Sequence, residues 1–431
     1  MALTGRTVLL AALGALLVGF AAPSWWGIAS VQGALLAGVL IDLVLAASVR
    51  ELRLTRSGDT SVRLGGTAQV DLTVHHPGRR RLRGMLRDAW PPSAGVVADR
   101  HPLLVPAGER RRLVTVLRPT RRGDRYSAGV TIRSVGPLGL AARQGSRELP
   151  WRVRVLPPFT SRRHLPSRLA RLRELDGRTS ILTRGQGTEF DSLREYVLGD
   201  DVRSIDWRAT ARTSEVMVRT WRPERDRYLL LVLDTGRGSA GRVGDAPRLD
   251  AAMDAALLLG ALASRAGDRV GLLVYDRAVR ASVSGVGAGE LLSALVNAMT
   301  PVQPELVETD VRGMVSAVLT RAPRRSLVVL FTGLDVVPVE EGLLPGLRSL
   351  IDRHLVLVAA VADPRIGQLA AARDDAAAVY AAAAAERVSA ERRHTAALLE
   401  RRGVTVVDAP PDRLAPALAD TYLSLKAAGR L

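Results

Sequence analysis

Residues 228–276 begin with the apolar run YLLLVLD (228–234), continue through RLDAAMDAALLLGALASRAG (248–267) and end with RVGLLVYD (269–276). Short continuous apolar runs are typical of strands buried on both faces, and the stretch between them has a helical pattern. The alternation continues with strand patterns at 326–333, 354–363 and 403–409, and helical patterns at 289–299, 311–319, 387–403 and 415–428. Residues 228–431 are therefore predicted to form an α/β domain with a doubly wound, mostly parallel sheet.

Three aspartates lie at or just after predicted strand ends in this domain. They are Asp234, Asp276 and Asp335. Ligands of open α/β sheets bind outside the carboxyl ends of the strands. This edge of the sheet is where we expect any chemistry.

Three stretches of the domain resemble the cation-binding loops of von Willebrand factor A-type domains. They are LVLDTGRGS (231–239), ETD (308–310) and LFTGLD (330–335). The resemblance implies a von Willebrand factor A-like fold with a site for Mg²⁺ or another divalent cation.

The resemblance to the cation site is incomplete. Gly236 and Gly238 stand where the family has serines, and Ser239 is one residue out of register. Mg²⁺ requires nearly octahedral oxygen ligands at short distances, so the loss of two hydroxyls predicts a degenerate site. The ligands carried over are Asp234, Ser239, Thr309 and Asp335.

The N-terminal 50 residues have the composition of a membrane segment. Between Thr7 and Val49 the only charged residue is Asp42. A bilayer core requires about 20 apolar residues per helix, so the run predicts a two-helix transmembrane hairpin, with spans at 7–22 and 29–48 joined by PSWWG. Asp42 could mark a transport pathway or an oligomer contact, or it could be hydrated near the end of its span.

The flanking charges predict the orientation of this hairpin. Arg6 precedes it, and Arg50, Arg53 and Arg56 follow it. The positive-inside tendency then places the soluble domains in the cytoplasm, with the chain anchored in the plasma membrane. A cleaved signal peptide is the alternative, which the second apolar span disfavours.

Residues 51–156 have a different pattern. Short alternating runs separated by Gly, Pro and Asp predict an antiparallel sandwich, and we expect an immunoglobulin-like β-domain. Residues 157–227 follow as a basic segment, in which leucines at spacings of three and four predict a helix packed on a neighbour or, less favoured, resting on lipid.

The same 157–227 segment contains GQGTEFDSLREYVLGDDVRSIDWRATAR (185–212). This stretch resembles the defining motif of the bacterial domain-of-unknown-function family 58, whose members occur beside MoxR-type AAA ATPases. The order of hairpin, β-domain, motif and A-type domain also resembles the family's layout. The resemblance implies a membrane-anchored accessory protein that works with a MoxR-type ATPase in the assembly or maturation of other proteins.

The motif itself predicts local structure. Ser192 and Glu195 have capping-box spacing, so SLREYVL is expected to form a helix that ends at Gly199. Asp200 and Asp201 are placed to cap the next turn, and Trp207 is expected to be a buried apolar anchor against the strand at 228–234. Arg203 and Asp206 are three residues apart and could pair.

Three functions are open for the motif. Its carboxylates could act in a metal-dependent hydrolase, its interleaved charges could form a structural ion-pair network, or its surface could dock a partner. Neighbouring arginines should hold carboxylate pKa values low, which disfavours the enzyme. The residues assigned to the structural and docking roles are Arg194, Tyr196, Asp200, Asp201, Arg203, Asp206, Trp207, Arg208 and Arg212.

Composition excludes several other classes of protein. The 431 residues contain no cysteine and a single lysine, Lys426, which excludes disulfides, thiolate chemistry, a P-loop and a Schiff-base lysine. A net charge of +18 could suggest nucleic acid binding. However, the arginines are spread through every segment and aromatic residues make up only 4%, so nucleic acid is not an expected partner.

Overall fold

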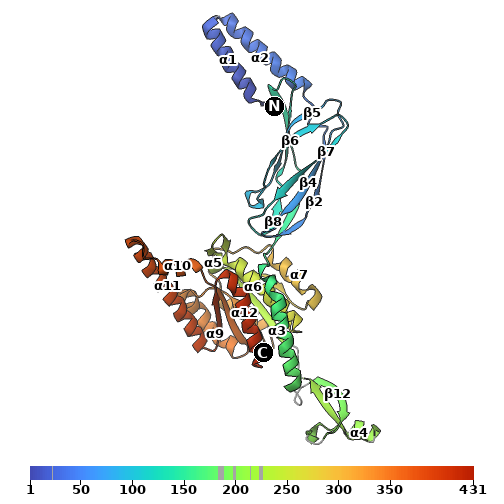
Figure 1. Cartoon of the computed structure of the whole chain (residues 1–431), viewed down its shortest axis with the longest axis vertical. Coiled ribbons are helices and arrows are strands. Elements are labelled where there is room, and N and C mark those ends of the chain that lie inside the picture. The colour runs from blue at the N-terminus through green and yellow to red at the C-terminus, as the bar shows by residue number, and fades with distance from the viewer. Residues whose placement is uncertain (22, 183–188, 198–199, 214, 223–226) are drawn as a thin grey trace. The chain divides into compact units, whose positions relative to one another are not determined.

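The structure is a computed structural model that describes residues 1–431 except 22, 183–188, 198–199, 214 and 223–226. It has mixed α/β architecture with several sheets and divides into two compact units, Met1–Leu156 and Pro157–Leu431. Figure 1 shows both units, coloured from blue at the N-terminus to red at the C-terminus.

The first unit begins with two apolar helices that lie side by side in Figure 1, α1 (Gly5–Ala21) and α2 (Trp25–Leu45). They pack closely enough that a Cβ at Gly14 would lie 2.4 Å from Val31 Cγ1. Among the described residues, α2 is the one helix that is both long and apolar enough to cross a membrane. The shorter α1 is also apolar.

The rest of the first unit consists of strands around two buried clusters. Most neighbouring strands are antiparallel, as expected. The exception is the pair β3 (Ser61–Arg63) and β11 (Arg152–Leu156), which is parallel. The other strands are β1 (Ala2–Leu3), β2 (Arg53–Gly58), β4 (Ala68–His75), β5 (Leu82–Ala89), β6 (Arg100–Val105), β7 (Arg110–Leu117), β8 (Gly123–Tyr126), β9 (Gly129–Val135) and β10 (Ala141–Arg147).

A buried ion pair joins strands of this β-region. Arg56 donates to Asp88 at 2.6 Å, and both side chains are almost fully buried. Asp88 also accepts hydrogen bonds from Trp90 Nε1 at 3.0 Å and Thr115 Oγ1 at 2.9 Å. Burial lowers the pKa of Arg56, and Asp88 opposes that shift. The carboxylate thus has the partners that a buried charge requires.

The second unit contains the predicted α/β sheet, which has six strands in the order β18-β17-β14-β19-β20-β21. Five of them are parallel, and only β18 at the edge is antiparallel. The order confirms the expected alternation of strands and helices. The strands are β14 (Tyr228–Asp234), β17 (Arg269–Tyr275), β18 (Val279–Val283), β19 (Leu327–Phe331), β20 (Leu355–Val361) and β21 (Thr405–Ala409).

Helices cover the sheet because successive strand residues point to opposite faces. Leu230 and Val232 of β14 belong to one buried cluster together with residues of the helices α8, α9 and α11. The helix α6, which packs against α12, contacts β14 and β17. The helices are α6 (Arg248–Arg265), α7 (Ala288–Met299), α8 (Val311–Arg321), α9 (Leu344–Ile351), α10 (Pro364–Ala371), α11 (Ala376–Arg401) and α12 (Pro411–Ala427).

The basic segment before the motif is helical, as predicted. The helix α3 (Leu165–Leu182) follows a short 3-10 turn, Thr160–His164, and packs against α6 and α12. Leu172 of the predicted leucine stripe is buried. This helix therefore packs on protein, as the favoured interpretation expected.

Candidate functional site

The strand order brings two predicted site loops together at one edge of the sheet. The neighbouring parallel strands β14 and β19 end at Asp234 and Phe331, and the chain leaves them in opposite directions across the sheet. This is the topological switch point at which ligands of open α/β sheets bind. Asp234 is buried there, whereas Asp335 is exposed.

Asp234 is the centre of a small hydroxyl cluster. Its Oδ1 accepts a hydrogen bond from Thr309 Oγ1 at 2.6 Å, and its Oδ2 accepts one from Thr332 Oγ1 at 2.7 Å. The backbone N–H of Gly236 also donates to Oδ1 at 2.9 Å. Asp234 and Thr309 thus meet as the resemblance implied. Thr332 was missed, although its place directly after the β19 strand was a signal that could have identified it.

Ser239 does not complete the cluster. Its hydroxyl donates to the main-chain oxygen of Asp234, so it stabilises the loop and does not extend the carboxylate cluster. It sits on the short helix α5 (Arg237–Ala240), one residue beyond the position that the resemblance requires.

The two glycines differ in the space around them. A Cβ at Gly236 would lie 2.1 Å from Thr309 Oγ1 and 2.9 Å from the Val307 oxygen, so a serine does not fit there without a shift. A Cβ at Gly238 would meet only Asp335 Oδ2, at 3.8 Å. The loop containing Gly238 therefore lies beside Asp335.

These residues only partly fit a Mg²⁺ ion. Two threonine hydroxyls and two carboxylates supply oxygen, but the two serine hydroxyls are missing and Ser239 is turned away. Across the part of the chain that the structure describes, no three His, Asp or Glu side chains lie together as a metal cluster.

The carboxylate of Asp276, directly after β17, forms an ion pair with Arg280. Asp276 is buried and accepts a hydrogen bond of 2.6 Å from Arg280 Nε. Burial pushes the pKa of Asp276 upward, but the hydrogen bonds from Arg280 and from the backbone amides of Arg277 and Ala278 outweigh burial and lower it. The group is thus held ionised and is a poor general acid at neutral pH.

The charged motif folds as a β-hairpin instead of the predicted helix. Residues Glu189–Glu195 form β12, which pairs antiparallel with β13 (Met217–Arg222). The backbone N–H groups join a cross-strand ladder, which overrides the local preference of the capping box. Gly199, the predicted helix terminator, lies outside the described residues. Between the strands are a 3-10 turn, Val202–Ser204, and the helix α4 (Trp207–Thr213).

The motif's aspartates build this connection between the strands. Asp201 caps the 3-10 turn as predicted, accepting from the Arg203 N–H at 3.0 Å. Asp206 caps α4 by accepting from the N–H groups of Arg208 and Ala209 at 2.9 and 3.1 Å. Asp206 also accepts a hydrogen bond of 2.8 Å from Arg219 Nε. It therefore pairs with Arg219, and the expected pairing with Arg203 is wrong.

One carboxylate of the motif has a lowered pKa, as the neighbouring arginines predicted. Hydrogen bonds from Ala209 and Arg219 lower the pKa of Asp206. Asp200 accepts a hydrogen bond from Arg194 and one of 2.9 Å from the Val197 N–H. The motif's aspartates thus form the ion pairs Arg194–Asp200 and Arg219–Asp206.

Trp207 is not the buried anchor that we expected. It is 67% exposed, whereas Val218 of β13, among the hairpin side chains that the structure describes, is buried at 4%. Val197 and Val202 are also largely exposed, at 60% and 62%. Helix α4 begins at Trp207, because Asp206 caps it, and this start leaves the indole in solvent.

The remaining predicted motif residues are on or near this surface. Arg208 and Arg212 of α4 are exposed, and Tyr196 is half-buried, with its backbone N–H donating to the Val216 oxygen at 2.8 Å. We define the motif surface as the exposed side chains of Val197, Val202, Trp207, Arg208 and Arg212.

Comparisons with curated proteins identify uncharacterized relatives. The chain is 30% identical over 195 residues to "Uncharacterized protein Rv1480" of Mycobacterium tuberculosis, and equally to "Uncharacterized protein Mb1516" of Mycobacterium bovis. The aligned region covers 45% of this chain and 61% of each relative's length.

The chain resembles parts of several solved structures. The CARDB domain of the PF1109 protein from Pyrococcus furiosus matches 24% of this chain and 86% of its own, with 15% identity and a TM-score of 0.19. A β-glucosidase from Listeria innocua matches 24% of this chain and 16% of its own, with 11% identity and a TM-score of 0.17. These scores are too low to indicate a shared overall fold.

The family comparison covers the motif from Ser192 onward and most of the α/β sheet. Residues 192–397 match the family described as "Protein of unknown function DUF58", and this region of the chain is thus a DUF58 family domain.

Proposed function

We propose that this chain is a membrane-anchored accessory protein whose motif surface binds a partner protein. The observation that carries the proposal is the 67% exposure of Trp207 beside the exposed Arg208. Tryptophan and arginine are the residue types most enriched at the energetic centres of protein interfaces. The aspartates next to them already cap turns or pair with arginines, and the five side chains of the motif surface are apolar or cationic.

The membrane anchor rests on α2. Its 21 residues are mostly apolar, and a helix of this length matches the thickness of a bilayer core. We propose α1 as a second span, because it is apolar and packs against α2. Arg50 and Arg53, which follow the helices, support a cytoplasmic orientation for the remaining domains.

We further propose that the α/β domain is von Willebrand factor A-like and the β-region immunoglobulin-like. The meeting of Asp234 and Thr309 beside the loop of Asp335 supports the first assignment. The mostly antiparallel strand pairing supports the second. In this proposal the A-type domain supplies a rigid support from which the motif hairpin meets its partner.

The partner that we propose is a MoxR-type AAA ATPase, with a role in the assembly or maturation of other proteins. This assignment comes from the resemblance of the motif. The cationic side chains of Arg208 and Arg212 would favour an acidic surface on the partner, because charge complementarity sets specificity and association rate.

The proposal is tested by affinity capture of the full chain from native membranes, with and without ATP, followed by mass spectrometry. The variant Trp207→Ala is compared with Tyr380→Ala, which removes another exposed aromatic side chain, on α11 (79% exposed). We expect a AAA ATPase to be captured by wild type and Tyr380→Ala but not by Trp207→Ala. Capture without any AAA ATPase, or equal capture by both variants, would contradict the proposal.

A metal-dependent hydrolase that uses the acidic motif is the less supported function. Both carboxylate oxygens of Asp206 already have partners, in the cap of α4 and in Arg219, and Oδ1 of Asp201 accepts from the Arg203 N–H. A hydrolase would require turnover that disappears in Asp201→Asn while the protein remains folded.

A further inference from the structure

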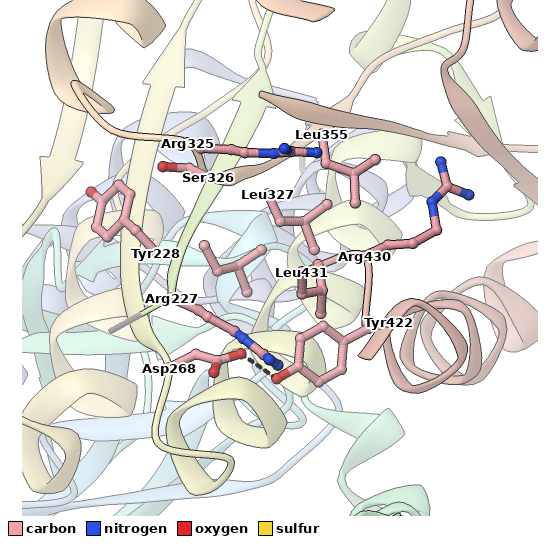
Figure 2. A pocket seen from close by; sticks show the side chains of 11 residues that line it. Arg227, Tyr228, Asp268, Arg325, Ser326, Leu327, Leu355, Tyr422, Arg430 and Leu431 are labelled. Carbon is pink, nitrogen blue, oxygen red and sulfur yellow. Dashed lines mark hydrogen bonds between the residues drawn. The ribbon is translucent and has the colours of Figure 1, made fainter. Parts of the chain in front are cut away.

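A separate pocket lies at the opposite edge of the α/β sheet from Asp234, where the strands begin (Figure 2). Its walls come from the start of β14, the residues before β17, the starts of β19 and β20, and the chain after α12. The cavity has a volume of about 100 Å³. This is several times the space that one water molecule requires.

The interior of the pocket is apolar. Leu229, Leu327 and Leu355 come from three neighbouring parallel strands, and Leu431 joins them from the chain after α12. Figure 2 shows Leu327, Leu355 and Leu431 grouped between the polar side chains. Such a surface favours a hydrocarbon group over water.

The polar side chains around the leucines are mostly cationic. Arg227, Arg325 and Arg430 line the pocket (Figure 2). Within the described ranges of the chain, none of these three guanidinium groups forms an ion pair. Among the described side chains of the lining, three are arginines and one, that of Asp268, is a carboxylate.

Asp268 does not neutralise these arginines, because it has other partners. Its Oδ2 accepts a hydrogen bond from the hydroxyl of Tyr422, and its Oδ1 pairs with Lys426 at 3.3 Å. Both Asp268 and Tyr422 are buried. The described side chains of the lining therefore carry excess positive charge next to an apolar surface.

We propose that this pocket binds a small organic acid with a short apolar tail. The carboxylate would accept charge-assisted hydrogen bonds from the arginines, whose planar forks suit that group. The tail would pack on the leucines. A neutral ligand leaves the charges uncompensated, and an inorganic anion leaves the apolar surface unused. The inference is independent of the proposed function, because the pocket shares no residue with the motif surface or with the Asp234 cluster.

The test uses the full chain in phosphatidylcholine nanodiscs, titrated with hexanoate by isothermal titration calorimetry. Empty nanodiscs are titrated in parallel to subtract partitioning of hexanoate into lipid. Hexanamide tests the need for charge, and acetate tests the need for the tail. We expect saturable binding of hexanoate that weakens at high salt, and binding of hexanamide and acetate at least about tenfold weaker.

The variants Arg325→Gln and Arg430→Gln remove pocket cations at exposed positions, where glutamine should not affect folding. Arg324→Gln is the matched control, because Arg324 is exposed beside Arg325 but does not line the pocket. We expect each pocket variant to weaken hexanoate binding about tenfold and the control to bind as wild type does. The proposal is overturned if hexanoate shows no saturable binding, if hexanamide binds as well, or if Arg324→Gln weakens binding as much as Arg325→Gln.

Discussion

The carboxylate of Asp42, near the end of the apolar helix α2, accepts a hydrogen bond of 2.7 Å from the backbone N–H of Leu138. It also accepts hydrogen bonds from the N–H groups of Leu140 and Ala141, and its side chain is fully buried. The charge in the apolar run is thus not hydrated. It attaches the end of α2 to the tight corner before β10, whose backbone donors need an acceptor.

Replacing Asp42 with asparagine should destabilise the first unit by about 1.5–3 kcal/mol. Asparagine has one acceptor oxygen instead of two, and its NH₂ group would face backbone donors, leaving buried polar groups unpaired. Thermal unfolding of the full chain in detergent measures the effect. Gln32→Ala, an exposed polar position on the same helix, is the control and should unfold as wild type does. Equal unfolding of the two variants would show that the Asp42 contacts contribute little.

Trp207→Ala should leave the free energy of unfolding within about 0.5 kcal/mol of wild type, because the indole is 67% exposed. Val218→Ala, at the buried position of the same hairpin, should cost about 1–3 kcal/mol. Denaturant unfolding of both variants separates the two expectations. A large loss in Trp207→Ala would instead mean that the indole is buried in solution, as the sequence had suggested.

Strands and helices with a long, regular pattern of apolar residues were predicted correctly from the sequence. The run at 228–234 is a buried strand, and the helix predicted at 248–267 is α6. These assignments hold because a parallel strand buried on both faces requires a continuous apolar run.

Residues 192–195 of the helix predicted for SLREYVL form a strand in the structure, and the reason is physical. SLREYVL has a good helical start, but it pairs with β13, where Met217 lies opposite Glu195 and Thr220 opposite Ser192. Cross-strand pairing with this distant segment decides its conformation. Local patterns do not contain that information. Asp234 and Thr309 were found from the sequence, whereas Thr332 depends on which strand neighbours β14.

The two glycines of the Asp234 loop should respond differently to serine. Gly236→Ser would force its Cβ to within 2.1 Å of Thr309 Oγ1, so we expect a loss of about 1–3 kcal/mol. Gly238→Ser has room and should be tolerated, because the nearest atom, Asp335 Oδ2, is 3.8 Å away. Thermal unfolding of both variants tests this difference.

The same measurement across millimolar Mg²⁺, Mn²⁺ and Ca²⁺ tests the cation site. Gly238→Ser adds a hydroxyl beside Asp335, so a cation that binds this edge should raise its melting temperature more than that of wild type. Asp234→Asn is the control, because it removes the central carboxylate and should abolish any cation effect. Unchanged melting temperatures of wild type and Gly238→Ser in all three metals would exclude a functional cation site.

Asp254 of α6 should make stability depend on pH in the acid range. Its buried carboxylate accepts hydrogen bonds from Thr160 Oγ1 at 3.1 Å and from Ser161 Oγ at 3.0 Å, which attach the turn before α3 to α6. Burial raises the pKa of Asp254 above its ordinary value of 3.8, although these hydrogen bonds oppose the shift. Because the folded state favours the protonated form, the contribution of Asp254 is fully present below about pH 3.8 and is lost as the pH rises through the raised pKa.

Asp254→Asn removes this titration and should flatten the corresponding part of the stability curve. The free energy of unfolding of wild type minus that of Asp254→Asn, measured by denaturant titration at several pH values, should therefore fall as the pH rises above about 3.8 and then level off. Asp245→Asn, at an exposed position, should give a difference that does not change with pH. A wild-type advantage that grows with pH would show that the hydrogen bonds from Thr160 and Ser161 outweigh burial, and would reverse the assigned direction of the pKa shift.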